Sequence, residues 1–205
     1  MELLWGVYVG VGIALILSVT LPRLKWTYWP LKALMGLLYL AMVQSKGLDL
    51  FEGSIFLFYY LGDLVLGIPT MDLRTKLQWG IVLFGLGHLL VIYALSQDVD
   101  VVMIGLLMGI LFFSFLGTVR YWIRTFNLEG LMGPVNAYVL VVMTMGVLGY
   151  MVISTKGILT LGITLFILSD GFLALWHFKR KPWVGFKVMN ILLYYTAVVL
   201  MIVSI

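Results

Sequence analysis

The chain of 205 residues is 63% hydrophobic and only 11% charged, whereas roughly 25% of the residues in an ordinary soluble domain are charged. This composition excludes a soluble protein with a single core, and eight membrane-crossing helices of about 20 residues each leave no room for a separate soluble domain. The formal charge of +4 can be interpreted only after the charged residues are assigned to the two sides of the membrane. Without cysteine the chain forms neither a disulfide nor a thiolate metal site.

Long apolar stretches, separated by charges, prolines and glycines, predict eight transmembrane helices. Continuous apolar runs without alternation favour helices over a closed barrel. The first run lacks a basic leader and exceeds a signal-peptide core, so we interpret it as a retained helix. The predicted fold is therefore all-α, a single integral membrane domain over residues 1–205. The expected helices are about Leu3–Leu21, Leu31–Ser45, Glu52–Ile68, Leu77–Ser96, Val101–Leu116, Pro134–Ser154, Gly157–Phe178 and Val184–Ser204.

The basic residues lie almost entirely on one side of this topology. The opposite side holds only Lys46 and Lys156. Because basic loops stay in the cytoplasm, we expect both termini outside, and we expect a bacterial cytoplasmic membrane. The surplus charge thus indicates orientation, and no nucleic-acid partner is expected. The basic side holds Arg23, Lys25, Lys32, Arg74, Lys76, Arg120, Arg124, Lys179, Arg180, Lys181 and Lys187.

Two pairs of segments suggest an internal repeat. Pro30–Ala33 resembles Pro134–Ala137, and Gly62–Gly67 resembles Ser169–Ala174, in the same order and at nearly equal offsets. We therefore predict a four-plus-four tandem repeat whose halves, about 1–98 and 99–205, are related by an axis along the membrane normal.

Asp63 and Asp170 lie inside predicted helices, where a carboxylate is costly and is a functional candidate by default. Both fall roughly 7–9 Å from the cytoplasmic helix ends, at 1.5 Å per residue. Across a twofold axis they could face one another and share a proton, as in aspartic proteases. In the alternative, each is a separate buried anion paired with Lys32, Lys187 or a tyrosine hydroxyl.

His88 is expected near mid-membrane, as either a catalytic group or a structural hydrogen-bonding residue. A polar track leads to it through Asn190, Tyr194 and Tyr195, and Lys32 and Asn136 would line its cytoplasmic mouth. We assign His177 to the membrane interface. Two distant histidines cannot form a three-histidine zinc site, and neither a P-loop nor a Gly-x-Ser-x-Gly elbow is present, so we predict no cofactor.

Several short blocks occur in a characteristic order. They are Leu61–Leu66, Phe84–His88, Pro134-Val135 with Tyr138 and Met143, Leu165–Asp170 with Leu173-Ala174, and Tyr194-Tyr195. In this order and spacing the chain resembles the YhhN-like lysoplasmalogenase family, over nearly its whole length. It departs from the family pattern in having Trp29-Pro30 with Lys32 where Lys-Pro is usual. It also lacks the tyrosine that commonly follows the histidine, the nearest being Tyr93.

The resemblance implies a membrane hydrolase that takes a lysophospholipid from the bilayer and cleaves its vinyl ether bond to a fatty aldehyde and a glycerophospho-head. One of Asp63 and Asp170 would be the acid, and the other, ionised, would stabilise the cation and guide water. His88 would assist proton transfer. Lys32 and Lys187 would meet the phosphate, and Asn136, Asn190, Tyr194 and Tyr195 would line the substrate site.

Other function classes use the same features. A proton-coupled transporter of a small amphiphile also needs intramembrane aspartates and a histidine. An intramembrane aspartyl protease needs two facing aspartates, although Tyr60–Asp63 matches its motifs poorly. A non-enzymatic scaffold is the third alternative. The sequence leaves the oligomeric state open.

Overall fold

The computed structural model describes residues 2–99, 130–179 and 181–205. Within these residues the fold is all-helical, as predicted, with seven α-helices, one short 3-10 helix and no strand. The predicted helix at about 101–116 lies outside the described residues, so the count of eight and the tandem repeat stay predictions. The elements are α1 (Glu2–Thr20), η1 (Pro22–Thr27), α2 (Tyr28–Lys46), α3 (Leu50–Gly67), α4 (Leu73–Ser96), α6 (Met132–Met151), α7 (Gly157–Phe178) and α8 (Val184–Ser204).

Six of these helices, α1, α3, α4, α6, α7 and α8, are long and apolar enough to cross a membrane. The remaining helix, α2, contains Lys32 and Lys46. A bundle with this many apolar helices is what an integral membrane protein requires, because helices satisfy their own backbone groups in lipid.

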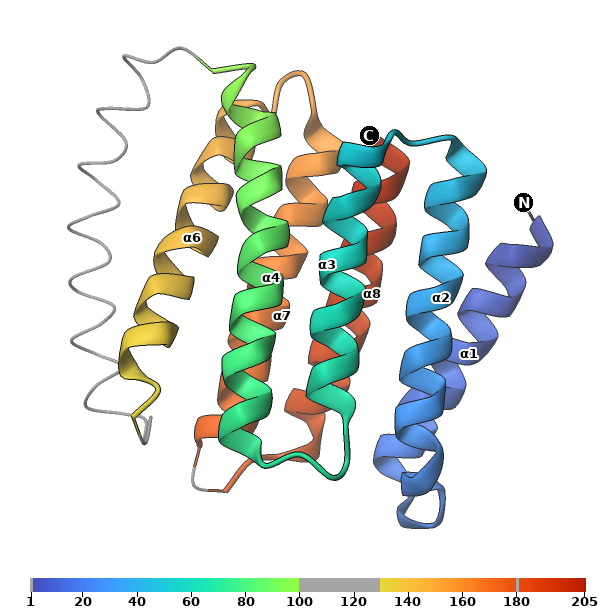
Figure 1. The fold of residues 1–205 in the computed structure, drawn as a ribbon. Helices are drawn as coiled ribbons and strands as arrows, with labels where there is room; N and C mark the ends of the chain where they lie inside the picture. Colours follow the sequence, from blue (N-terminus) through green and yellow to red (C-terminus); the bar gives the residue numbers. More distant parts are fainter. Residues whose placement is uncertain (1, 100–129, 180) are drawn as a thin grey trace.

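The helices run up and down beside one another (Figure 1). α3 packs along α4, and α7 packs along α8. α2 packs on α3, α6 packs on α4 and α7, and α1 packs on α2 and α8. The connection from α3 to α4 and that from α7 to α8 lie at the same end as η1, whereas both chain termini lie at the other end (Figure 1). This first end, which carries Arg23, Lys25, Arg74 and Lys76, is called the basic end below.

Local signals fix where the helices around the site begin. Asp49 and Glu52 form a capping box at the start of α3, with side-chain to backbone distances of 2.8 and 3.1 Å. Asp72 caps α4 by accepting a hydrogen bond from the Thr75 backbone at 2.9 Å, and this bond lowers the pKa of the Asp72 carboxyl. α2 begins at Tyr28 rather than at the predicted Leu31, because proline is tolerated in a first helical turn.

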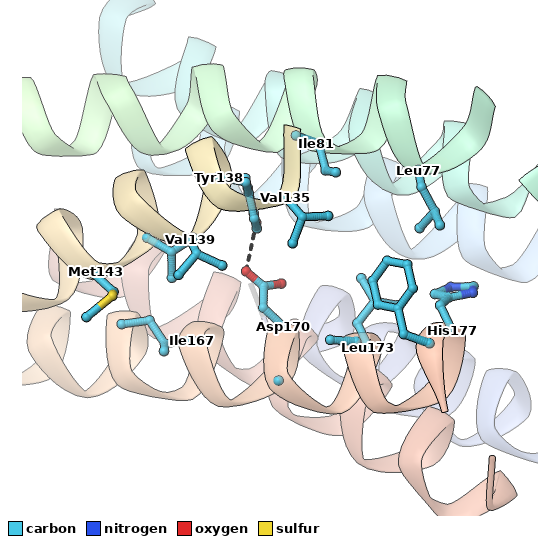
Figure 2. A pocket seen from close by; sticks show the side chains of 14 residues that line it. Leu77, Ile81, Val135, Tyr138, Val139, Met143, Ile167, Asp170, Leu173 and His177 are labelled. Atoms are coloured by element: carbon cyan, nitrogen blue, oxygen red, sulfur yellow. Dashed lines mark hydrogen bonds between the residues drawn. The ribbon is translucent and has the colours of Figure 1, made fainter. Parts of the chain in front are cut away.

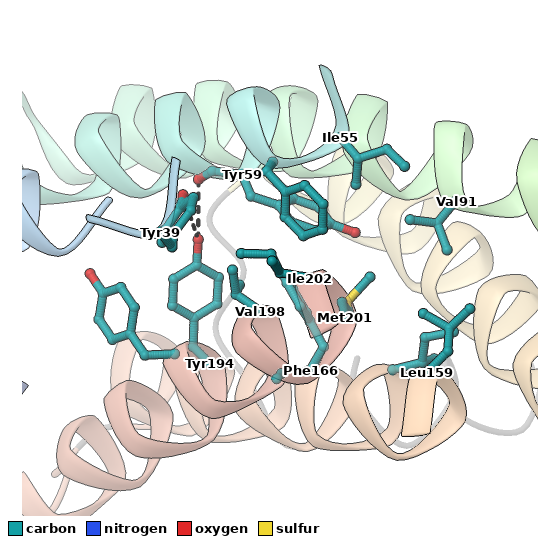
Figure 3. Packing of buried hydrophobic residues seen from close by; sticks show 14 of the residues in the cluster. Tyr39, Ile55, Tyr59, Val91, Leu159, Phe166, Tyr194, Val198, Met201 and Ile202 are labelled. Atoms are coloured by element: carbon teal, nitrogen blue, oxygen red, sulfur yellow. Dashed lines mark hydrogen bonds between the residues drawn. The ribbon is translucent and has the colours of Figure 1, made fainter. Parts of the chain in front are cut away.

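Aromatic rings fill the space between the α3–α4 pair and the α7–α8 pair. Tyr59 of α3 lies 4.8 Å from Phe166 of α7, centroid to centroid, and Phe166 lies 5.3 Å from Tyr194 of α8. In Figure 3, Tyr194 reaches across to Tyr39 and to the backbone of Tyr59. A Cβ at Gly87 would lie 2.5 Å from the Tyr59 ring, so only glycine lets this ring pack so close to α4.

The N-terminal helix α1 is joined to this core. The Tyr8 hydroxyl donates a hydrogen bond to the Tyr195 backbone oxygen of α8 at 3.0 Å, and Leu15 is fully buried. The first helix is thus packed into the bundle next to a residue of the site described below.

Candidate active site

Asp63, on α3, is held by a donor at each carboxylate oxygen. Lys32 Nζ lies 2.8 Å from Oδ1, and the Tyr195 hydroxyl donates to Oδ2 at 2.6 Å. The Asp63 and Lys32 side chains are each only 8% exposed. A Cβ at Gly67 would lie 3.2 Å from the Lys32 stem, so this glycine makes room for the lysine. In an ion pair this well buried, each group is the counterion of the other.

Asp170, on α7, has a different set of partners. The Tyr138 hydroxyl of α6 donates to Oδ2 at 2.7 Å. Among the described residues, no lysine or arginine forms an ion pair with Asp170, and the nearest basic atom is His88 Nε2 at 3.9 Å. Within the described part of the chain, Asp170 therefore lacks the lysine counterion that Asp63 has.

His88, on α4, connects two tyrosines. Its Nδ1 lies 2.9 Å from the Tyr59 hydroxyl, and its Nε2 lies 3.0 Å from the Tyr138 hydroxyl. Tyr138 uses its one hydrogen on Asp170, so the Tyr138 oxygen accepts from Nε2–H, and Nδ1 accepts from Tyr59. In the reverse direction the Tyr59 hydroxyl would lack an acceptor among the described residues. The chain of donors therefore points from Tyr59 toward Asp170 Oδ2, and a proton held by Asp170 sits on Oδ1.

Two cavities meet at Asp170. The larger, of about 350 Å³, lies between α4, α6 and α7, and apart from Asp170, Tyr138 and His177 it is lined by apolar residues (Figure 2). The smaller, of about 60 Å³, is lined by both apolar and polar residues, the latter including Lys32, Asp63, Lys187 and Asn190. Because it is the more polar of the two, it is called the polar cavity below. Asp170, Leu173 and His177 line both cavities. In Figure 2 the second oxygen of Asp170 points away from Tyr138.

An amphiphilic molecule fits this arrangement. The volume of the apolar cavity lies within the range of about 300–1,000 Å³ for small-molecule sites. The polar cavity is large enough for ordered water, which needs at least about 10–15 Å³ and polar partners. A group held between the two cavities would therefore meet Asp170 with an apolar chain on one side and water on the other.

The two aspartates do not face one another as a hydrogen-bonded pair. Both residues are described, and no hydrogen bond joins their carboxyl groups; each has partners of its own. The helix rotations decide this, because equal depth in the membrane does not place two side chains in contact. The alternative, in which each aspartate is buried separately with its own partner, describes the structure, with Lys32 as the partner of Asp63 and a tyrosine as that of Asp170.

The structure brings most of the other predicted site residues together. Tyr194 and Asn190 line the polar cavity, and Asn190 donates to the Ser169 hydroxyl at 2.9 Å. Tyr195 reaches Asp63, whereas His88 lines neither cavity and reaches Asp170 through Tyr138. Asn136, predicted for the mouth, also lines neither cavity.

Sequence reasoning missed several residues. His177, assigned to the membrane interface, lines both cavities. Tyr59 lies one helical turn before Asp63, a spacing that places both on one face of α3, and this was the available signal. The described residues contain no cluster of three or more His, Cys, Asp or Glu side chains that could bind a metal.

Comparison with known proteins gives one match. The family model described as the YhhN family covers residues 27–205, which include α2 and every later described helix. Neither the curated proteins nor the solved structures contain a significant match.

Proposed function

Because the chain belongs to the YhhN family, we propose that it is a membrane hydrolase that cleaves the vinyl ether bond of lysoplasmalogens, releasing a fatty aldehyde and a glycerophospho-head. One observation carries the proposal. Asp170 stands where an apolar cavity meets a polar one, so the bond between an alkyl chain and a polar head would lie beside an acid. In this proposal the basic end faces the cytoplasm, as the positive charges predict.

The different partners of the two aspartates support different roles. Asp170, without a paired cation, holds a proton on Oδ1 and delivers it to the alkene carbon that does not carry the ether oxygen. The other carbon becomes an oxocarbenium ion, as in glycoside hydrolysis. Asp63, paired with Lys32, orients a water molecule on the polar side.

The remaining steps close the cycle. Water adds to the cationic carbon and forms a hemiacetal, and the proton it loses returns to Asp170. The hemiacetal hydroxyl then loses its proton as its oxygen forms the carbonyl double bond, and the bond to the glycerol oxygen breaks. The glycerol oxygen takes up one proton and leaves as an alcohol, while the chain leaves as an aldehyde. His88 acts through Tyr138. The Tyr138 hydroxyl holds Oδ2 of Asp170, so the proton-bearing Oδ1 of Asp170 points away from Tyr138.

The test uses the purified full chain with a 1-alkenyl lysophospholipid in heavy water. We expect aldehyde that carries one deuterium next to its carbonyl carbon, since the acid step places a solvent-derived proton there. Asp170→Asn should lower the rate about 10²–10⁴-fold, the usual contribution of general acid catalysis. Release of a fatty acid from an acyl lysolipid, or normal aldehyde release by Asp170→Asn, would contradict the proposal.

Proton-coupled transport of an amphiphile is the second candidate. The hydrogen-bonded chain from Tyr59 through His88 and Tyr138 to Asp170 favours it, because transporters use such groups to move protons. Vesicles containing the protein and an imposed proton gradient separate the two candidates. Accumulation of an intact lysolipid, without aldehyde, would support transport and exclude the hydrolase.

A further inference from the structure

Only one of the two lysines in the polar cavity is available to a ligand. Lys32 is neutralised by Asp63 at 2.8 Å. Lys187 lines the same cavity and has no carboxylate partner among the described residues. A partly buried cation without a paired anion favours a ligand that brings one.

Two aromatic rings hold Lys187 in place. Its Nζ lies 3.8 Å from the centroid of the Tyr28 ring and 5.6 Å from that of Trp176, within the range of cation–π contacts. Both rings line the polar cavity. They are the kind of surface that binds a quaternary ammonium ligand, but here the protein's own ammonium group occupies it.

The surroundings of Lys187 add further positive charge. Lys25, Lys32 and Lys76 all act on it electrostatically with the same sign. Lys187 is also the fourth residue of α8, near the positive end of the helix dipole, where an anion is stabilised. The two carboxyl groups of the cavity do not offset this, because Asp63 is paired and Asp170 lies at the junction with the apolar cavity.

We propose that Lys187 binds the phosphate of the substrate head. The site then recognises the glycerophosphate and does not recognise the amine attached to it. This rests on the proposed function for the identity of the substrate. With the chain in the apolar cavity and the ether at Asp170, the phosphate falls on the polar side, where Lys187 is the available cation. Choline, ethanolamine and unsubstituted phosphate heads are then accepted alike.

Binding of uncleavable analogues to the detergent-purified full chain tests the site without turnover. The probes are 1-O-alkyl glycerophosphocholine, glycerophosphoethanolamine and glycerophosphate, with 1-O-alkylglycerol as the phosphate-free reference. We expect the first three to bind within about threefold of one another. The reference should bind at least about tenfold more weakly, as expected for the loss of a charge-assisted hydrogen bond. Inorganic phosphate alone should compete with the three phosphate analogues but not with alkylglycerol.

Lys187→Gln should weaken the three phosphate analogues about tenfold and leave alkylglycerol unchanged, whereas Lys187→Arg should retain most of the binding. Lys179→Gln is the matched control, because it removes one positive charge close to the start of α8 from a residue that lines neither cavity. It should change no affinity by more than about twofold, since exposed charges are screened.

Three outcomes would overturn the proposal: equal loss of alkylglycerol binding in Lys187→Gln, equal effects of the two glutamine variants, or a choline analogue that binds tenfold better than glycerophosphate. The comparison of analogues on the unmodified chain needs no variant to fold. Aldehyde release without phosphate-dependent binding would refute the phosphate site alone. Phosphate-dependent binding without aldehyde release would refute the proposed reaction alone.

Discussion

A carboxyl group is costly inside an apolar helix bundle, and the surroundings of Asp63 and of Asp170 offset this cost in different ways. Asp63 has a lysine at one oxygen and a tyrosine hydroxyl at the other, so its charge is balanced where it stands. Asp170 has a single tyrosine hydroxyl, supported through His88 by a second tyrosine, and its other oxygen is left for the cavity. Among the described residues, one aspartate is thus paired with a cation, and the other is held by a hydroxyl group.

Lys32, near the start of α2, contributes to this difference. In the predicted repeat, Asn136 on α6 corresponds to Lys32 on α2. Lys32 reaches across to Asp63, whereas Asn136 lines neither cavity and leaves Asp170 without a cation. If the predicted repeat holds, the two carboxyl groups differ because a basic residue stands in one half where a neutral residue stands in the other.

Removing the carboxylates one at a time should give the largest contrast in stability. Asp63→Asn leaves Lys32 buried without its counterion, which costs about 3–5 kcal/mol in buried pairs. Asp170→Asn leaves no cation without its counterion and keeps an acceptor for Tyr138. We therefore expect the free energy of unfolding to fall by no more than about 1.5 kcal/mol. Thermal unfolding of the two variants in the same detergent measures this, and Asp63→Asn should melt at the lower temperature.

A double variant provides the control for that comparison. Replacing Lys32 with Met and Asp63 with Leu together removes both charges and should recover most of the lost stability, while aldehyde release should stay low because the carboxylate is gone. Equal melting temperatures for Asp63→Asn and Asp170→Asn would show that the ion pair is not what distinguishes the two regions.

Two glycines of α4 allow a smaller perturbation on the Asp170 side. A Cβ at Gly87 would lie 2.5 Å from the Tyr59 ring, whereas one at Gly85 would lie 4.0 Å from the Tyr138 ring. Gly87→Ala should displace Tyr59, weaken its bond to His88 and destabilise the protein by about 1–3 kcal/mol, as overpacking does. Gly85→Ala should be neutral or slightly stabilising, because alanine favours helix.

Activity and thermal unfolding of both alanine variants should be measured together. If Gly85→Ala were as harmful as Gly87→Ala, helix packing in general, rather than the position of Tyr59, would explain the effect.

The smallest effect is expected at Asp72, an exposed carboxylate that serves as a reference for the two inside the bundle. The hydrogen bond from the Thr75 backbone lowers its pKa in the folded protein, so its cap stabilises α4 above the unfolded pKa and is lost as pH falls through the folded one. Asp72→Ala should lower the melting temperature slightly at pH 7, and the difference from the unmodified chain should shrink as the pH falls below the ordinary aspartate pKa of 3.8. A difference that does not shrink as the pH is lowered would refute the charge-dependent cap.

Much of this fold follows from the hydrophobic pattern. The ends of α7 and α8 agree with their predicted bounds, Gly157–Phe178 and Val184–Ser204. Lys156, Lys179 and Trp183 mark three of these four ends in the sequence. α6 ends at Met151 rather than at Ser154, since an apolar run does not show where helical hydrogen bonding stops. The length and polarity of an apolar run therefore predict that a membrane span is present more accurately than they predict where its last helical turn ends.

The site was partly predictable for a related reason. Asp63, Asp170 and His88 are conspicuous because lipid disfavours them, but depth along a helix is one coordinate, and contact also depends on rotation. Rotation turns Asp63 to Lys32, and it turns Asp170 to Tyr138. Tyrosine is common in apolar helices, so its spacing of one helical turn from Asp63 is only a weak signal that Tyr59, which contacts His88, differs from an ordinary core residue.

The hydrogen bond from Tyr8 to Tyr195 has a consequence for chimeric proteins. The residues that identify the family begin at position 27, yet α1 lies before them and contacts the helix whose Tyr195 holds Asp63. A chimera that took only residues 27–205 from this chain would leave the face of α8 that α1 contacts exposed to lipid. The segment that matches the family model is therefore shorter than the segment that a chimera would have to include.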